Sequence, residues 1–181
     1  LKGGLGFGGP CFPRDNRAFS AMAELRGIKA PFAEHTDNYN AGIAEKMVNL
    51  MLNHAGSESK IGILGLSYKP GTGFCEESQG LNIAKKLAAL NYKTNVFEIN
   101  GFHHAKTLLG NLVNYMENLD EFLNESDIIF LTNWDNNNQI LKNKKINRRL
   151  IIIDPWRQFS INDFSEPIVY KPLGIGEINI Q

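Results

Sequence analysis

The sequence has little of several features that define specialised classes of protein. Its 181 residues include only two cysteines, Cys11 and Cys75, so a framework of disulfides is not expected. Nineteen basic residues balance nineteen acidic ones, which leaves no global field to hold nucleic acid or an anionic membrane. No apolar run approaches the roughly 20 residues of a membrane span. We therefore expect a protein of the reducing cytoplasm, without nucleic-acid or membrane partners, that grips any anionic ligand at a local site.

The composition is that of a folded protein, with 43% hydrophobic and 21% charged residues. The length suits one domain, or one domain and part of another. The chain begins with Leu1 and a glycine-rich stretch instead of methionine. We therefore expect the N-terminal part of a longer protein to be missing.

Two helical patterns occupy the first third of the chain. The stretch 15–27 has apolar residues at helical spacing, and a second pattern runs from Pro31 to about Ala55. That second helix would be roughly 36 Å long. Its apolar residues are too numerous for one small domain to cover, which predicts a homodimer through helix 31–55. These residues are Phe32, Tyr39, Ile43, Met47 and Met51.

The remainder, from residue 57, alternates short apolar runs with helical patterns. Strands are predicted at 60–64, 94–97, 128–131, 150–153 and 168–170, and helices or turns at 79–90, 103–109, 120–124 and 137–142. The uninterrupted apolar run Leu150–Ile153 favours a sheet covered on both faces. The predicted fold class is α/β, a Rossmann-like parallel sheet preceded by two helices.

The first motif that could carry chemistry runs from Gly6 to Asp15. Its glycines allow a backbone to approach a ligand closely, and Cys11 follows them just before a helix. An arginine, Arg14, and the helix N-terminus would favour a thiolate there. The alternative is that Cys11 is a small buried hydrophobe, Arg14 a surface charge and Asp15 a helix N-cap.

The second motif begins at Gly65, after the first strand of the α/β part. The dinucleotide fingerprint G-x-G-x-x-G aligns here as Gly65, Ser67 and Pro70, so two glycines are missing and NAD is not expected to bind in the usual way. Lys69 could meet a phosphate or carboxylate, or it could be an exposed lysine on a turn. Glu98 stands where such folds place a ribose-binding acid, and we expect a surface or sugar-nucleotide contact instead.

Together the two motifs resemble those of the UDP-glucose/GDP-mannose dehydrogenase family. Gly6–Asp15 is similar to the family's catalytic-cysteine motif, and Gly65–Ser78 to the motif that opens its C-terminal domain. The resemblance implies an NAD-dependent oxidation of a sugar C6 alcohol to a carboxylate, with UDP-glucose as the preferred substrate. It also implies that residues 1–56 end a central helical dimerisation domain, that residues 57–181 form a UDP-sugar-binding domain, and that the NAD-binding domain is absent from this chain, which should be inactive alone.

The resemblance assigns roles to individual residues. Cys11 matches the nucleophile that forms a thiohemiacetal and then a thioester, and Asp15 the aspartate that assists hydrolysis. Arg14 stands where the family has a lysine near the cofactor. Tyr68 and Lys69 match substrate contacts. The loop along the sugar nucleotide matches Leu5, Gly6, Phe7 and Gly8.

Departures and alternatives remain at several places. Glu76 replaces an arginine that reaches the cofactor in many members, and Cys75 has no family role. We expect the charges of Glu76 and Glu77 to raise the pKa of Cys75. A GDP-mannose dehydrogenase, or a non-catalytic nucleotide-sugar-binding and dimerisation module, are the alternative functions.

Two further stretches are weaker candidates for a functional site. His103 and His104 lack partners, so no metal site is expected. Residues 154–157 follow a buried strand at the ligand-binding edge, but a strand-ending turn with Trp156 packed against the protein is preferred.

Overall fold

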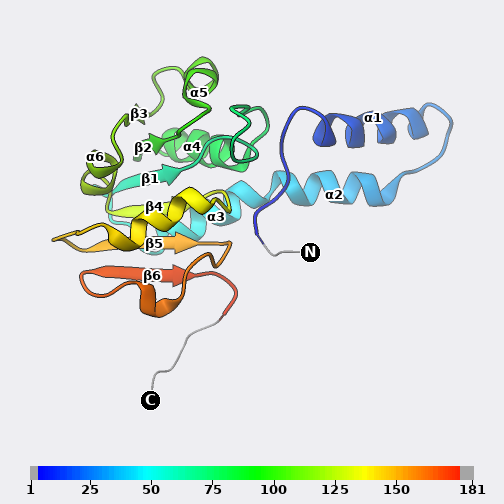
Figure 1. Cartoon of the computed structure of the whole chain (residues 1–181). Helices are drawn as coiled ribbons and strands as arrows, with labels where there is room; N and C mark the ends of the chain where they lie inside the picture. The colour runs from blue at the N-terminus through cyan, green and yellow to red at the C-terminus, as the bar shows by residue number, and fades with distance from the viewer. Residues whose placement is uncertain (1–3, 176–181) are drawn as a thin grey trace.

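Two helices project from an α/β domain in the computed structural model, which describes residues 4–175 (Figure 1). Helices α1 (Phe12–Glu24) and α2 (Pro31–Ala41) form an antiparallel hairpin, and α3 (Ile43–Leu52) continues from α2 to the sheet. The chain turns between α1 and α2 at Gly27, whose φ of +69° favours glycine. Helix α1 begins three residues earlier than the predicted 15–27, because Pro13 is accepted in a first helical turn.

The predicted continuous helix 31–55 is wrong in its bounds. Gly42 separates α2 from α3, although its dihedral angles (φ −79°, ψ −12°) remain near helical, and α3 ends at Leu52. Glycine is a weak helix former, which explains a break at this position. The predicted exposure of this helix is also wrong for α3: Met51 is fully buried, and Ile43 and Met47 are half-buried.

Six parallel strands form the sheet, in the order β3-β2-β1-β4-β5-β6. The predicted parallel α/β fold is confirmed, and the five expected strands are present within one or two residues of their predicted bounds. The two-residue β3 was missed because it is too short to show a pattern. The strands are β1 (Lys60–Leu64), β2 (Lys93–Phe97), β3 (Asn114–Tyr115), β4 (Ile128–Leu131), β5 (Leu150–Asp154) and β6 (Ile168–Pro172).

Both faces of the sheet are covered. One face packs against α3, α4 (Gln79–Ala89) and α5 (Phe102–Leu109), and the other against α6 (Leu119–Asn124), the 3₁₀ segment η1 (Asn136–Asn143) and the region of η2 (Ile161–Asp163). Along β5, Ile151 and Ile153 enter the first core, whereas Leu150 and Ile152 enter the second. Successive side chains of a strand point to opposite faces, so an entirely apolar strand fits a sheet buried on both sides.

The strand order places a crevice at the carboxyl ends of β1 and β4. Connections run in opposite directions from these two neighbours, which is where open α/β sheets bind ligands. The strand arrowheads in Figure 1 point towards the side from which the hairpin projects. The Gly6–Asp15 motif and the carboxyl edge of the sheet therefore lie on the same side of the molecule.

Candidate functional site

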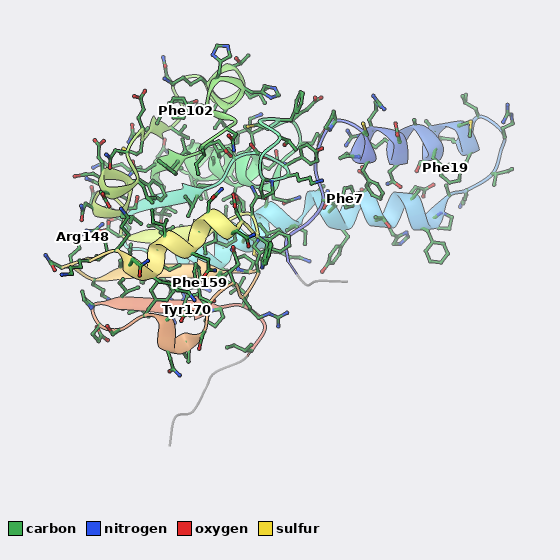
Figure 2. The ribbon with its side chains drawn as sticks, viewed as in Figure 1. Phe7, Phe19, Phe102, Arg148, Phe159 and Tyr170 are labelled. Carbon is green, nitrogen blue, oxygen red and sulfur yellow. The ribbon has the colours of Figure 1, made fainter. Side chains whose placement is uncertain are left out.

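The glycine-rich loop is fixed at the junction between the hairpin and the α/β domain, where Figure 2 shows Phe7. The Phe7 N–H donates to Oδ1 of Asn40 (2.9 Å), and Nδ2 of Asn40 donates to the Phe7 carbonyl (2.9 Å). Nε2 of Gln79, at the start of α4, donates to the same carbonyl (3.2 Å). The peptide groups of Phe7 are thus committed to two amide side chains from different parts of the fold. Sequence reasoning missed both, because Asn40 and Gln79 lie in polar stretches without a distinctive pattern.

Three glycines bring the loop into contact with the α/β domain. A Cβ at Gly6 would lie 2.7 Å from Nε2 of Gln79, besides 2.1 Å from Oδ1 of Asn40 on α2, and one at Gly8 would lie 2.4 Å from the carbonyl oxygen of Glu77. Gly9 has a φ of +90° and packs against the Tyr68 ring, 2.6 Å from a built Cβ. A side chain at any of these positions would push the loop off the domain. The glycines therefore serve docking as well as any approach to a ligand.

The loop borders a groove of about 1070 Å³ that continues along α2 and the start of α3. Of the predicted substrate-binding residues, Leu5, Gly6 and Phe7 line it, whereas Gly8 is packed against Glu77. Tyr39 and Lys46 also line the groove. The groove is large enough for a small-molecule ligand.

Cys11 is exposed at the N-terminal end of α1. It occupies the N-cap position, and its carbonyl accepts the Asp15 N–H (2.8 Å). The alternatives of a buried Cys11 and of Asp15 as N-cap are therefore wrong. A helix N-terminus favours a nearby negative charge, and Cys11 stands at such an end.

Arg14 and Asp15 form an ion pair with each other. Nη2 of Arg14 lies 2.8 Å from Oδ1 of Asp15, and the hydrogen bond to this carboxylate is the main reason that the pKa of Arg14 is raised, with a smaller contribution from Cys11. Both side chains are exposed, so the pair adds little to stability. The guanidinium near Cys11 is therefore already shared with a carboxylate.

The second motif forms a long loop, residues 65–78, between β1 and α4. Tyr68, near the start of the loop, packs against Gly9, and its backbone N–H donates to the Phe74 carbonyl (2.8 Å). Lys69 is exposed next to it, and its carbonyl accepts bonds from Thr72. The fold thus brings Tyr68 against the Gly6–Asp15 motif, whereas Lys69 forms no hydrogen bond or ion pair with these residues.

The end of the same loop is joined to the cysteine motif by polar contacts. The Gly9 N–H donates to the Glu76 carbonyl (3.0 Å), and the Glu76 side chain is exposed. Glu77 has a φ of +54°, and its carboxylate binds Nη2 of Arg17 on α1 at 2.8 Å. Glu76 therefore joins the two motifs through its backbone carbonyl, and Glu77 joins the second loop to helix α1.

Cys75 is fully buried, and its thiol faces the Gly101 carbonyl (3.5 Å). Burial raises the pKa of Cys75 to about 11, and the charge of Glu98 adds to the increase. The direction agrees with the sequence-based prediction, but the predicted cause is wrong: the groups responsible are the protein interior and Glu98, not Glu76 and Glu77.

The side chain of Glu98, which was predicted to lie at the surface or to contact a sugar nucleotide, points towards the backbone of the β1–α4 turn. Glu98, directly after β2, accepts the backbone N–H groups of Leu66 (2.6 Å) and Ser67 (2.7 Å). In a dinucleotide fold, amides of this turn meet the diphosphate. Since a carboxylate already takes them, the β1–α4 turn does not fit the diphosphate of NAD.

The other weaker candidates have structural roles. Trp156 donates its indole N–H to the Thr132 carbonyl (2.9 Å) and lies against Gly4, while the buried Asp154 accepts the Trp156 N–H (2.8 Å). The preferred turn with a packed Trp156 is therefore confirmed. Nδ1 of His104 accepts the Cys75 N–H (3.2 Å).

Residues 4–175 contain neither a cluster of metal ligands nor a membrane-spanning helix. No group of three or more His, Cys, Asp or Glu in this part of the chain could hold a metal ion. No helix found there is both long and apolar enough to cross a lipid bilayer.

Comparison with known proteins identifies both parts of the chain. The profile of the UDP-glucose/GDP-mannose dehydrogenase family, UDP binding domain, matches residues 62–161, and that of the family's central domain matches residues 1–42. A UDP-glucose 6-dehydrogenase of Bacillus subtilis is 33% identical over 140 residues, which cover 74% of this chain and 31% of the relative. A GDP-mannose 6-dehydrogenase of Azotobacter vinelandii is 32% identical over 145 residues, which cover 75% and 33%. The chain spans about one third of the length of these relatives.

Solved structures share the fold. A UDP-glucose dehydrogenase from Pyrobaculum islandicum superposes with a TM-score of 0.74 at 24% identity, over 93% of this chain and 38% of the other. A GDP-mannose dehydrogenase from Pseudomonas aeruginosa gives 0.72 at 24% identity, over 93% and 40%. One family profile alone matches more than half of the chain. The chain therefore belongs to the UDP-glucose/GDP-mannose dehydrogenase family, the nucleotide-sugar 6-dehydrogenases.

Proposed function

We propose that the protein containing this chain oxidises the C6 alcohol of UDP-glucose to the carboxylate of UDP-glucuronate, with Cys11 as the nucleophile. Residues 1–56 would carry the cysteine and the helices of a central domain, and residues 57–181 would bind the nucleotide sugar. The observation that supports this most strongly is the packing of Gly9 against Tyr68, because it joins the cysteine loop to the proposed substrate loop.

The steps proposed for this chain take place on the Cys11 sulfur. Before these steps, the C6 alcohol loses a first hydride and a proton to become the aldehyde. The Cys11 thiolate attacks this aldehyde, and the resulting alkoxide takes up a proton to give a thiohemiacetal. The thiohemiacetal then loses a second hydride and a proton to become a thioester. Water then adds to the thioester carbonyl, and the thiolate leaves with formation of the carboxylate. NAD would be the hydride acceptor on the family resemblance, but the β1–α4 turn does not fit its diphosphate. We therefore assign no step of NAD binding to this turn.

The neighbours of Cys11 support binding and hydrolysis in this proposal. Asp15 lies one helical turn after Cys11 and would orient the attacking water, with Arg14 holding its carboxylate and reaching towards the cofactor. Tyr68 and Lys69 would contact the nucleotide sugar from the second loop, where the lysine ammonium suits a diphosphate. The groove beside Leu5, Gly6 and Phe7 would hold part of the ligand, with Gly8 keeping the loop docked.

The experiment measures by mass spectrometry how much UDP-glucuronate the protein and its Cys11→Ser variant form from UDP-glucose. The serine variant should form no UDP-glucuronate, because an alcohol is a far weaker nucleophile at neutral pH, while Cys75→Ser should remain active.

Substrate choice is tested by calorimetry with UDP-glucose and GDP-mannose. Lys69→Ala should weaken the binding of the preferred nucleotide sugar, with the exposed Lys145→Ala as the control. Normal acid formation by Cys11→Ser would exclude the mechanism.

We further propose a homodimer through the helical hairpin, instead of the whole predicted helix. The large exposed apolar side chains of this part lie on α1 and α2 and in the turn between them. Exposed apolar patches of this kind usually mark protein–protein interfaces, which supports the hairpin as the dimer interface. They are Phe12, Phe19, Met22, Leu25, Ile28, Phe32 and Tyr39. Light scattering should give twice the mass of one chain, and a monomer that persists at tens of micromolar would contradict the proposal. Phe32→Ser, at a side chain 90% exposed, should shift the mass towards one chain.

A further inference from the structure

The carboxylate of Glu98 occupies a small concavity of backbone N–H groups at the carboxyl end of β1 and β2. One oxygen, Oε2, accepts from the successive amides of Leu66 (2.6 Å) and Ser67 (2.7 Å). The other oxygen, Oε1, accepts from Asn100 (3.0 Å). No salt bridge to Glu98 is found among residues 4–175, so three amide dipoles compensate its charge there. Successive amides arranged in this way are a general binding site for anions.

The same place in a dinucleotide-binding sheet holds a diphosphate by two devices, the amides of the first turn and the N-terminus of the helix that follows. In this chain the N-terminus of that helix is also capped by a side chain of the protein. Helix α4 begins only at Gln79, and Oγ of Ser78 accepts the Leu81 N–H (3.0 Å) while it donates to the Leu66 carbonyl (2.5 Å). The turn and the helix start are therefore both closed by side chains of this chain.

We propose that Glu98 is an internal substitute for a phosphate: its carboxylate fills the anion cradle of the β1–α4 turn, excludes diphosphates from it, and fixes the start of the loop that carries Tyr68 and Lys69. A carboxylate that accepts two amides at 2.6–2.7 Å forms charge-assisted hydrogen bonds, which are stronger than neutral ones. Ser67 and Tyr68 are consecutive, so the anchor lies directly before the proposed substrate contact. The inference goes beyond the proposed function, because it holds whether or not Cys11 is a nucleophile.

The test removes the Glu98 carboxylate from the cradle and then adds another anion. In Glu98→Ala, the amides of Leu66 and Ser67 should exchange hydrogen at least roughly tenfold faster than in the unmodified chain, since hydrogen bonds to charged groups are lost. Inorganic pyrophosphate, or acetate, should then slow this exchange and raise the melting temperature, relative to chloride at the same ionic strength. In the unmodified chain, neither anion should change the exchange of these two amides. Glu117→Ala removes an exposed glutamate that has no hydrogen bond or ion pair with any of residues 4–175, and it serves as the control.

Glu98→Gln keeps the size of the side chain and remains informative if the alanine variant does not fold. Its carboxamide lacks the charge and has a single acceptor, so the three amides should exchange faster than in the unmodified chain, but added pyrophosphate should have no effect because the cradle stays filled. Unchanged exchange at Leu66 and Ser67 in either variant would overturn the proposal. Equal protection by pyrophosphate of the unmodified chain and of Glu98→Ala would overturn it too, since the turn would then be open to diphosphates.

Discussion

The two cysteines should differ greatly in their reaction with iodoacetamide near pH 7. Cys11 is exposed, whereas Cys75 is fully buried and its pKa is raised to about 11. Each pKa unit changes the thiolate fraction tenfold, so the thiolate of Cys75 is roughly a hundredfold or more scarcer than that of an ordinary cysteine. Burial lowers the rate further, because the reagent reaches Cys75 only after local opening of the core.

The assay is peptide mass spectrometry of samples quenched over time. Modification at Cys11 should be complete while Cys75 is still almost unmodified, and in denaturant the two cysteines should react at similar rates. The variants Cys11→Ser and Cys75→Ser identify which modification belongs to which peptide. Similar rates in the folded protein would refute the reasoning, because neither the burial of Cys75 nor its raised pKa could then hold in solution.

Three further predictions concern stability. Asn40→Ala should lower the free energy of unfolding by about 1–3 kcal/mol in urea titrations, and Asn40→Asp by at least as much, because aspartate keeps the bond to the Phe7 N–H but turns a second acceptor oxygen towards the Phe7 carbonyl. Gly9→Ala should cost more than Gly27→Ala by urea titration: both positions have positive φ, but only a Cβ at Gly9 meets a side chain, the Tyr68 ring. The raised pKa of Cys75 stabilises the fold below the unfolded-state value of about 8.5, and this contribution is lost as pH rises towards 11. The stability difference between the unmodified chain and Cys75→Ala should therefore shrink over that range, and a constant difference would contradict this.

The parallel α/β fold could be predicted from the sequence because it depends on patterns that lie close together in the chain. The apolar run Leu150–Ile153 can be satisfied only if both faces of its strand are covered, and the structure covers both. The helix pattern from Pro31 was less informative. A single glycine, Gly42, divides it, and the core against α3 decides that Met51 is buried while Phe32 is exposed.

The order of the two motifs and the residue types they contain came from the sequence, but their contacts did not. Asn40 and Gln79 hold the Phe7 peptide from positions 33 and 72 residues away in the chain, and no local pattern marks such a pairing. Sequence reasoning attributed the loss of NAD binding to missing glycines at Ser67 and Pro70. The tertiary structure adds the stronger reason, that Glu98 fills the turn with its own carboxylate.

The sequence by itself therefore determined the fold class, the position of Cys11 before a helix and the absence of a complete dinucleotide fingerprint. These follow from periodicity, from composition and from residues adjacent in the chain. Only the tertiary structure decided that Cys75 is inaccessible, that Arg14 is shared with Asp15, and that Glu98 faces inward. Burial, ion pairing and amide contacts depend on distances between side chains, and the packing of the whole chain sets those distances.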